Sequence, residues 1–100
     1  MFRILIIDDD PNICLFFETL LEKMDCETYT AKTINEAKAL SRRNEFDIIL
    51  LDCELPDGNG LDIMPDFVAQ PSSPEIIIIT GKGDARGAEI AFKNGAWDFV

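Results

Sequence analysis

Residues 47–60 read DIILLDCELPDGNG, and the fold class can be inferred from this stretch. Apart from Asp47, residues 46–51 are continuously apolar, which is typical of a parallel strand buried on both faces. The strand ends at Asp52, and a cluster of turn-forming residues follows at 56–60. A buried strand that leads from a carboxylate into a Pro/Gly loop favours an α/β protein with a site at the end of its sheet.

Toward the amino terminus, the pattern predicts two more strands and two helices. Residues 3–7 are an apolar, β-branched strand. Asp10 is a typical N-cap, Pro11 suits the first helical position, and apolar residues at helical spacing predict a helix over 11–24. Residues 27–31 predict a short strand. Thr33 and Glu36 form a capping box that opens a second helix, which fades near residues 43–44.

Toward the carboxyl terminus, the alternation continues. Apolar residues from Leu61 to Val68 predict a third helix, and a loop with two prolines covers 70–74. Residues 75–80 predict a strand, 85–93 a fourth helix, and 97–100 the start of a fifth strand. Strands that alternate with helices imply right-handed crossovers and a parallel sheet covered on both faces. A length of 100 residues is that of one domain.

Composition excludes several classes of function. The formal net charge of −10 argues against direct contact with nucleic acid. Without histidine, Ser-His and Cys-His catalysis and imidazole zinc sites are excluded. No apolar run approaches the ~18 residues of a membrane span, and the amino terminus is not a signal peptide. Three widely spaced cysteines form neither a disulfide framework nor a CxxC site and favour the reducing cytoplasm.

Three predicted strands end in residues that can carry chemistry. Asp8 and Asp9 follow the first strand, Asp52 follows the third, and Thr80 ends the strand predicted at 75–80. If those strands are neighbours, three carboxylates converge, and their mutual repulsion calls for a cation. Oxygen ligands select a hard ion, and Mg²⁺ fits best. A carboxylate beside such an ion can attack phosphorus and form an aspartyl-phosphate.

Each strand end also has a simpler interpretation. Asp8 to Asp10 can be a solvated helix start that favours the helix dipole, and Thr80 can be an ordinary β-branched strand residue. Asp52 is harder to dismiss, because its strand is apolar throughout. The functional signal is the combination, since one edge of one sheet collects all of these residues.

Four stretches of the sequence resemble the receiver domain of two-component response regulators. They are residues 4–10 (ILIIDDD), 47–60, 77–81 (IIITG) and 94–99 (NGAWDF). The resemblance covers the whole chain in order and spacing. It implies a flavodoxin-like, three-layer αβα sandwich whose five-stranded parallel sheet has the order 2-1-3-4-5.

The resemblance also implies a role for each site residue. Asp52 becomes the phospho-acceptor, phosphorylated by a sensor histidine kinase, a phosphotransfer protein or a small phosphodonor. Asp8, Asp9 and the backbone carbonyl of Glu54 bind Mg²⁺ together with Asp52. The hydroxyl of Thr80 swings to a phosphoryl oxygen, and Phe99 occupies an aromatic switch position.

The sequence departs from the family pattern at its end. The family has a lysine two positions beyond Val100 and then a fifth helix. We therefore expect residues 1–100 to be a receiver domain truncated at the fifth strand, taken from a longer parent chain with an effector domain. Residues 80–84 and 95–99 resemble receivers of nitrogen-regulator-type transcription activators. The domain would be a signalling switch and not an enzyme.

The first helix carries more apolar residues than one strand needs. In the family, the fifth helix packs beside it. Without that helix, an apolar patch of Phe16, Phe17, Leu20 and Leu21 should stay exposed and favour self-association, with a homodimer as one outcome. Taken as a pair, however, Phe16 and Phe17 are most simply read as core residues.

Three alternative functions compete with this interpretation. A haloacid-dehalogenase-type phosphatase also opens with strand-Asp-x-Asp, which Asp8 and Asp10 match, but Asn12 breaks its motif and the chain is small for that fold. A calcium loop fails because Ile13 replaces the required glycine. A receiver-like interaction module that is never phosphorylated is disfavoured by the full set of Asp8, Asp9, Asp52 and Thr80.

Overall fold

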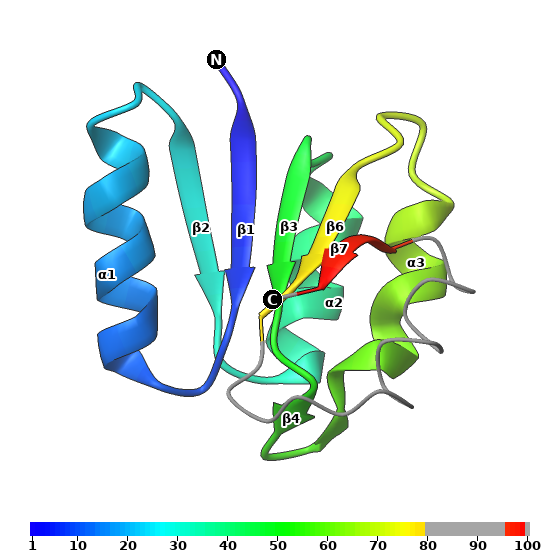
Figure 1. Cartoon of the computed structure of the whole chain (residues 1–100). Coiled ribbons are helices and arrows are strands. Elements are labelled where there is room, and N and C mark those ends of the chain that lie inside the picture. Colours follow the sequence, from blue (N-terminus) through cyan, green and yellow to red (C-terminus); the bar gives the residue numbers. More distant parts are fainter. Residues whose placement is uncertain (80–95, 100) are drawn as a thin grey trace.

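A computed structural model describes residues 1–79 and 96–99 of the chain. Five parallel strands form one sheet in the order β2-β1-β3-β6-β7, which is the predicted order 2-1-3-4-5 (Figure 1). Their bounds are β1 Arg3–Ile7, β2 Glu27–Ala31, β3 Ile48–Leu51, β6 Glu75–Ile78 and β7 Ala96–Phe99. The predicted flavodoxin-like sheet is thereby confirmed.

The register of the central strands aligns their carboxyl ends. Ile7 of β1 lies opposite Leu51 of β3, and Leu51 lies opposite Ile78 of β6. The backbone N–H of Asp52 donates to the carbonyl of Ile7 at 2.9 Å, so pairing continues one residue past β3. The residues that directly follow β1 and β3 are therefore held side by side.

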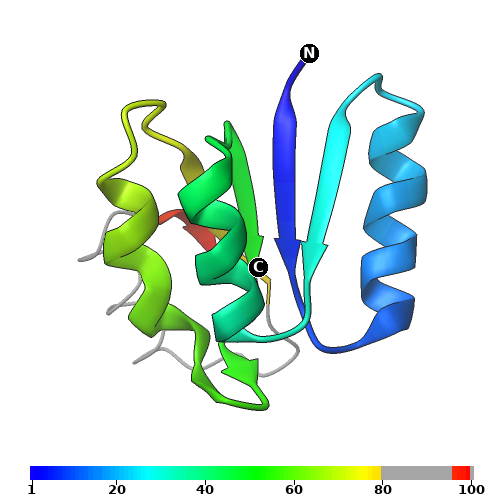
Figure 2. The same ribbon diagram turned by 180° about the vertical axis from the view of Figure 1, so that it is seen from behind.

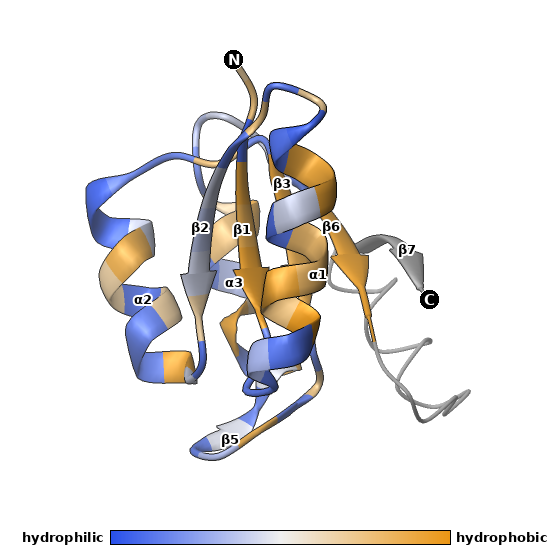
Figure 3. Ribbon diagram, turned by 90° about the vertical axis from the view of Figure 1, so that its left-hand side faces the viewer, coloured by the Kyte–Doolittle hydropathy of each residue, from blue (hydrophilic) through white to orange (hydrophobic). Residues whose placement is uncertain are grey.

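Helices cover both faces of the sheet. Helix α1 (Pro11–Glu22) lies on one face, and α2 (Ile34–Arg43) and α3 (Met64–Val68) lie together on the other (Figures 2 and 3). The larger core lies between the sheet and the α2–α3 layer, where Phe46 makes edge-to-face contacts with Tyr29 and Phe67. A smaller core packs Phe17 and Leu21 of α1 against the sheet. This arrangement is the predicted three-layer sandwich.

Helix caps follow the sequence signals closely. The Asp10 side chain accepts a hydrogen bond from the Asn12 N–H at 2.9 Å, with Pro11 in the first turn as predicted. The Thr33 hydroxyl accepts from the Glu36 N–H at 3.1 Å at the start of α2. Helix α1 ends at Glu22, slightly before the predicted end, and the chain turns at Asp25, whose φ is +58°.

Two segments differ in detail from the prediction. The turn cluster at 56–60 contains a small antiparallel hairpin of β4 (Glu54–Leu55) and β5 (Gly58–Asn59). The third helix begins as a 3₁₀ turn, η1 (Gly60–Ile63), before α3 starts at Met64. Pro65 gives the physical reason, because it lacks the N–H that would continue one regular α-helix through this point. The predicted fourth helix at 85–93 lies outside the described residues.

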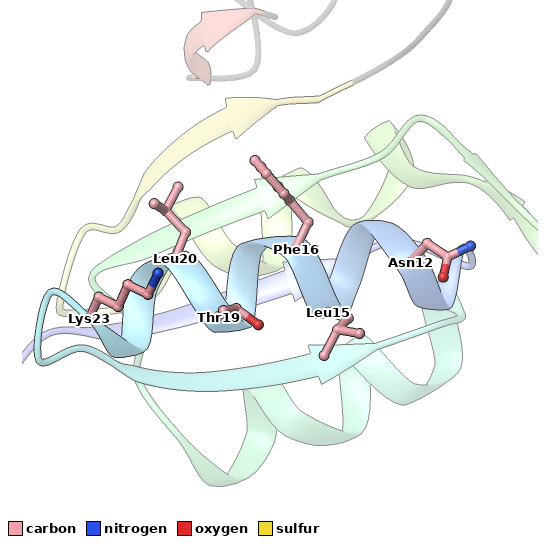
Figure 4. A pocket seen from close by; sticks show the side chains of 6 residues that line it. All are labelled: Asn12, Leu15, Phe16, Thr19, Leu20 and Lys23. Carbon is pink, nitrogen blue, oxygen red and sulfur yellow. The ribbon is translucent and has the colours of Figure 1, made fainter.

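The outer face of α1 is apolar. Phe16 and Leu15 are each 62% exposed and Leu20 is 46% exposed, and Figure 4 shows Phe16 and Leu20 projecting from the same side of the helix. The interpretation of Phe16 as a core residue is therefore wrong. The predicted exposed patch is present in part, since Phe16 and Leu20 are exposed whereas Phe17 and Leu21 pack against the sheet. The reason is that Phe17, and not Phe16, falls on the side of α1 that faces the sheet. Among the described residues, no helix combines the length and apolarity that crossing a membrane requires.

Candidate metal and phosphoryl site

Three carboxylates meet at the carboxyl edge of the sheet. Asp8 and Asp9 directly follow β1, and Asp52 directly follows β3. One carboxylate oxygen from each lies within 4.8 Å of the others. Asp8 is buried, Asp52 is half-buried and Asp9 is exposed. The structure thus brings together the three acids that the sequence placed at strand ends.

Backbone hydrogen bonds fix the positions of the two inner acids. The Asp8 N–H donates to the carbonyl of Ala31 in β2 at 3.0 Å, and the Asp52 N–H donates to Ile7 as described. The Asp8 carboxylate accepts from the Asp10 N–H at 2.9 Å. The Asp52 carboxylate accepts from the Glu54 N–H at 3.3 Å. Each side chain therefore keeps acceptor capacity for a further ligand.

The electrostatics of the cluster oppose full ionisation. Burial raises the pKa of Asp52 from 3.8 to about 6, and the charges of Asp8, Asp9 and Glu54 add to the rise, while the Glu54 N–H opposes it. Burial also raises the pKa of Asp8, partly offset by the hydrogen bond from the Asp10 N–H. At neutral pH Asp52 is nevertheless mainly ionised, because its pKa of about 6 lies below 7, so the site holds negative charge that a cation would stabilise.

The donor set fits a hard divalent cation. The converging ligands are carboxylate oxygens, which suit Mg²⁺ better than a soft metal. The nearby thiol of Cys14 is buried and donates at 3.3 Å to the backbone carbonyl of Asp8, which directs it away from the role of a metal ligand. The residues present are thus compatible with Mg²⁺ and do not favour zinc.

The loop after Asp52 is built around a close backbone approach. The Gly60 N–H donates to the Cys53 carbonyl at 2.7 Å. A Cβ at position 60 would overlap the backbone carbonyl oxygen of Asp52, so a residue with a side chain could not take this conformation. Gly60 therefore lets the loop fold back directly beside the acidic cluster.

The remaining predicted site residues are less fully placed. Glu54 has an exposed side chain, and its backbone N–H bonds to Asp52, so its role as a carbonyl ligand stays a prediction. Thr80 lies outside the described residues. Phe99 ends β7, of which the backbone alone is described.

Sequence reasoning missed Asp57. The pattern Pro56-Asp57-Gly58 indicated a turn and gave no partner for the carboxylate. In the structure this side chain binds the start of α2, 23 residues earlier in the chain. Only the tertiary fold reveals such a contact, because nothing local pairs Asp57 with Ile34.

Comparison with known proteins assigns a family. The family model described as "Response regulator receiver domain" matches residues 4–100. The response regulator protein PilR of Pseudomonas aeruginosa is 37% identical over 98 residues, which are 98% of this chain and 22% of that protein. The transcriptional regulatory protein SrrA of Staphylococcus aureus is 32% identical over 98% of this chain and 40% of its own length. The chain thus spans well under half the length of these relatives.

A solved structure extends the likeness to three dimensions. The non-phosphorylated HemR receiver domain from Leptospira biflexa superposes with a TM-score of 0.90 and is 34% identical. The match covers 100% of this chain and 81% of the HemR chain. Sequence and fold therefore point to the same family.

Proposed function

Because the chain belongs to the response regulator receiver domain family, we propose that it is a phosphorylation-dependent switch that accepts a phosphoryl group on Asp52. The observation that carries this proposal is the convergence of Asp8, Asp9 and Asp52 within 4.8 Å at the sheet edge. Of the three, Asp52 is the residue whose backbone the tight loop at Gly60 approaches closely. It is ionised at neutral pH, since its raised pKa of about 6 still lies below 7.

The proposed chemistry is transfer of a phosphoryl group to a carboxylate. A carboxylate oxygen of Asp52 attacks phosphorus, forming an O–P bond while the bond between phosphorus and the donor nitrogen of a phosphohistidine breaks. The leaving nitrogen keeps the electron pair and takes a proton from solvent. Asp8 and Asp9, with the Glu54 carbonyl, would hold Mg²⁺. When bound, the ion neutralises charge on the phosphoryl oxygens. Thr80 would contact a phosphoryl oxygen afterwards.

The partners follow from the same proposal. A sensor histidine kinase or a phosphotransfer protein would supply the phosphoryl group in the cytoplasm. An effector would receive the signal, and transcription is its proposed target, since SrrA is named a transcriptional regulatory protein and this chain covers 40% of it. The domain itself would turn over no free substrate, so we do not propose an enzyme.

The phosphatase alternative is weakened by one contact. A haloacid-dehalogenase-type site needs its second aspartate, here Asp10, beside the nucleophile. Instead, the Asp10 carboxylate accepts the Asn12 N–H and caps α1, and the three-acid cluster consists of Asp8, Asp9 and Asp52. The arrangement therefore favours an acceptor centred on Asp52.

Intact-mass spectrometry with acetyl phosphate and Mg²⁺ tests the proposal. The wild type should gain one phosphoryl group, and peptide mapping after reductive trapping should place it on Asp52. Asp52→Asn should gain none, because the amide is a poor nucleophile. Asp66→Asn, the same change at an exposed acid of α3, should behave as the wild type.

Three results would contradict the proposal. Phosphorylation of the Asp52→Asn protein to the wild-type level would place the acceptor elsewhere. Steady hydrolysis of many equivalents of a free phosphate ester would favour the phosphatase alternative. A wild type that stays unmodified with acetyl phosphate and with a phosphorylated histidine kinase would favour the interaction module.

A further inference from the structure

Asp57 joins the loop after Asp52 to the start of α2. It lies in the two-residue turn between β4 and β5. One oxygen of its carboxylate accepts from the Ile34 N–H at 2.8 Å, and the other accepts from the Asn35 N–H at 3.0 Å. Both oxygens of a loop residue thus bind the first turn of a helix that is distant in the sequence.

This contact completes the capping of α2. The first N–H groups of a helix have no partner within the helix. The Glu36 N–H is bound by the Thr33 hydroxyl, and the Ala37 N–H by the Thr33 carbonyl. Asp57 binds the two that remain, those of Ile34 and Asn35. Helix α2 therefore has a local cap from Thr33 and a second cap from Asp57, in the loop that follows Asp52.

The hairpin that carries Asp57 is short and tightly packed. Glu54 pairs with Asn59 and Leu55 with Gly58, which leaves two residues in the turn. Gly58 has a φ of +145°, and a Cβ there would lie 3.1 Å from the Ile34 side chain. A displacement of the turn that carries Asp57 would therefore be transmitted along the hairpin to Glu54, whose N–H donates to the Asp52 carboxylate.

We propose that Asp57 is a positioning residue: by capping α2 it anchors the β4–β5 hairpin, and the anchored hairpin sets the Mg²⁺ affinity of the acidic cluster. This inference rests on the proposed function, because it assumes that the cluster binds Mg²⁺. The hydrogen bonds from Ile34 and Asn35 also hold the pKa of Asp57 below its usual range, so the carboxylate is ionised and both oxygens accept. By linkage, Mg²⁺ bound at the cluster would in turn stabilise the start of α2.

Calorimetric Mg²⁺ titration of matched variants tests this coupling. Asp57→Ala should weaken Mg²⁺ binding by about fivefold, and Asp57→Asn, which keeps one acceptor, should fall between it and the wild type. Thr33→Ala also removes a cap of α2 but does not touch the hairpin, so its Kd should match the wild type. Both Ala variants should lower the melting temperature by a few degrees.

Two controls separate positioning from charge and from general destabilisation. The Asp57→Ala effect should persist at high ionic strength, where the loss of one distant charge is screened. An effect that vanishes in salt, or an equal effect of Thr33→Ala, would overturn the proposal. An unchanged Kd in Asp57→Ala would do the same.

Amide hydrogen exchange of the metal-free protein decides the structural step independently. In Asp57→Ala, the amides of Glu54 and Gly60 should exchange severalfold faster, while in Thr33→Ala the increase should be confined to α2. Protection of the Glu54 and Gly60 amides equal to the wild type would overturn the anchoring role. A third outcome is also possible: the wild type binds no Mg²⁺, but the Glu54 and Gly60 amides still exchange faster in Asp57→Ala. This outcome would refute the Mg²⁺ site and the link to affinity, while the anchoring role of Asp57 would stand.

Discussion

Asp52 is held in a place that is unfavourable for its own charge. Burial is the main cause of its raised pKa, and the neighbouring acids add to it. A buried carboxylate of this kind lowers the stability of the folded state. Residues with such perturbed pKa values are common at functional sites. The consequence can be measured as a dependence of stability on pH.

We predict that the metal-free protein loses stability as the pH rises from about 4 to about 6. In that window the folded state, in which the Asp52 pKa is about 6, binds more protons than the unfolded state, in which it is about 3.8. The loss is nearly complete by about pH 7, one unit above the folded-state pKa. At pH 7 Asp52→Asn should therefore be more stable than the wild type by about 1 to 2 kcal/mol, after allowance for solvent screening.

Urea denaturation at pH 4, 5, 6 and 7 without divalent cations measures this difference. The advantage of Asp52→Asn should shrink toward pH 4. Asp66→Asn, at an exposed site, should follow the wild-type profile. A variant-to-wild-type difference that does not change with pH would show that Asp52 is not the residue responsible.

Asp8, Asp9 and Asp52 could be predicted to converge because their positions depend on strand ends, and strand ends are visible in an apolar pattern. Asp57 could not, because its partner depends on how the hairpin folds against α2. Gly60 was assigned to the loop by its residue type, but the overlap with the Asp52 carbonyl is a tertiary fact. Local chemistry was thus readable from the sequence, whereas contacts between loops and distant helices were not.

At the level of elements, the buried strands were the most predictable part of the fold. Residues 3–7, which form the buried strand β1, were predicted with their observed limits, because a continuous apolar, β-branched run is typical of a strand buried on both faces. The stretch from 60 to 68 was not, because its apolar spacing indicates a helix without showing that Pro65 divides it into a 3₁₀ turn and an α-helix. The fourth helix remains a prediction.

Gln70 links three elements at the end of the sheet opposite the acids. Its side-chain oxygen accepts from the Phe46 N–H at 3.3 Å. Its side-chain nitrogen donates to the carbonyls of Ser41 and Asn44 at 3.1 and 3.0 Å. One amide side chain thereby joins the end of α2, the start of β3 and the loop after α3.

Gln70→Ala should destabilise the protein by about 1 to 3 kcal/mol, because it leaves partly buried backbone groups without partners. Phosphorylation of Asp52 and Mg²⁺ affinity should be unchanged, since the hydrogen bonds of Gln70 lie at the other end of the strands. Chemical denaturation and the mass assay check both parts. A loss below about 0.5 kcal/mol would mean that water replaces these hydrogen bonds.

On the scale of the whole molecule, an acidic surface coexists with the apolar outer face of α1. The formal net charge is −10, and Phe16 and Leu20 remain largely exposed in the structure. Like charge keeps copies apart, whereas exposed apolar area favours their association. Which effect dominates depends on ionic strength.

We predict that this chain self-associates at high protein concentration and that salt increases the association, because salt screens the repulsion between copies. The double variant Phe16→Gln, Leu20→Gln should stay monomeric under the same conditions, with a melting temperature close to that of the wild type. Sedimentation velocity at low and high salt makes the comparison. Equal sedimentation of both proteins at high salt would show that this face does not drive association.

The register between β1 and β3 also restricts how such a chain can evolve. Ile7 faces Leu51, so the acids that follow them share one level of the sheet. One residue inserted into either strand would shift the register and turn the following carboxylate toward the opposite layer of helices. Insertions and deletions would therefore be removed by selection inside β1 and β3. The turns at the opposite end, near residues 23–26 and 70–74, can change length without moving an acid. Lineages descended from this chain should differ in length at these turns and keep a fixed length inside β1 and β3.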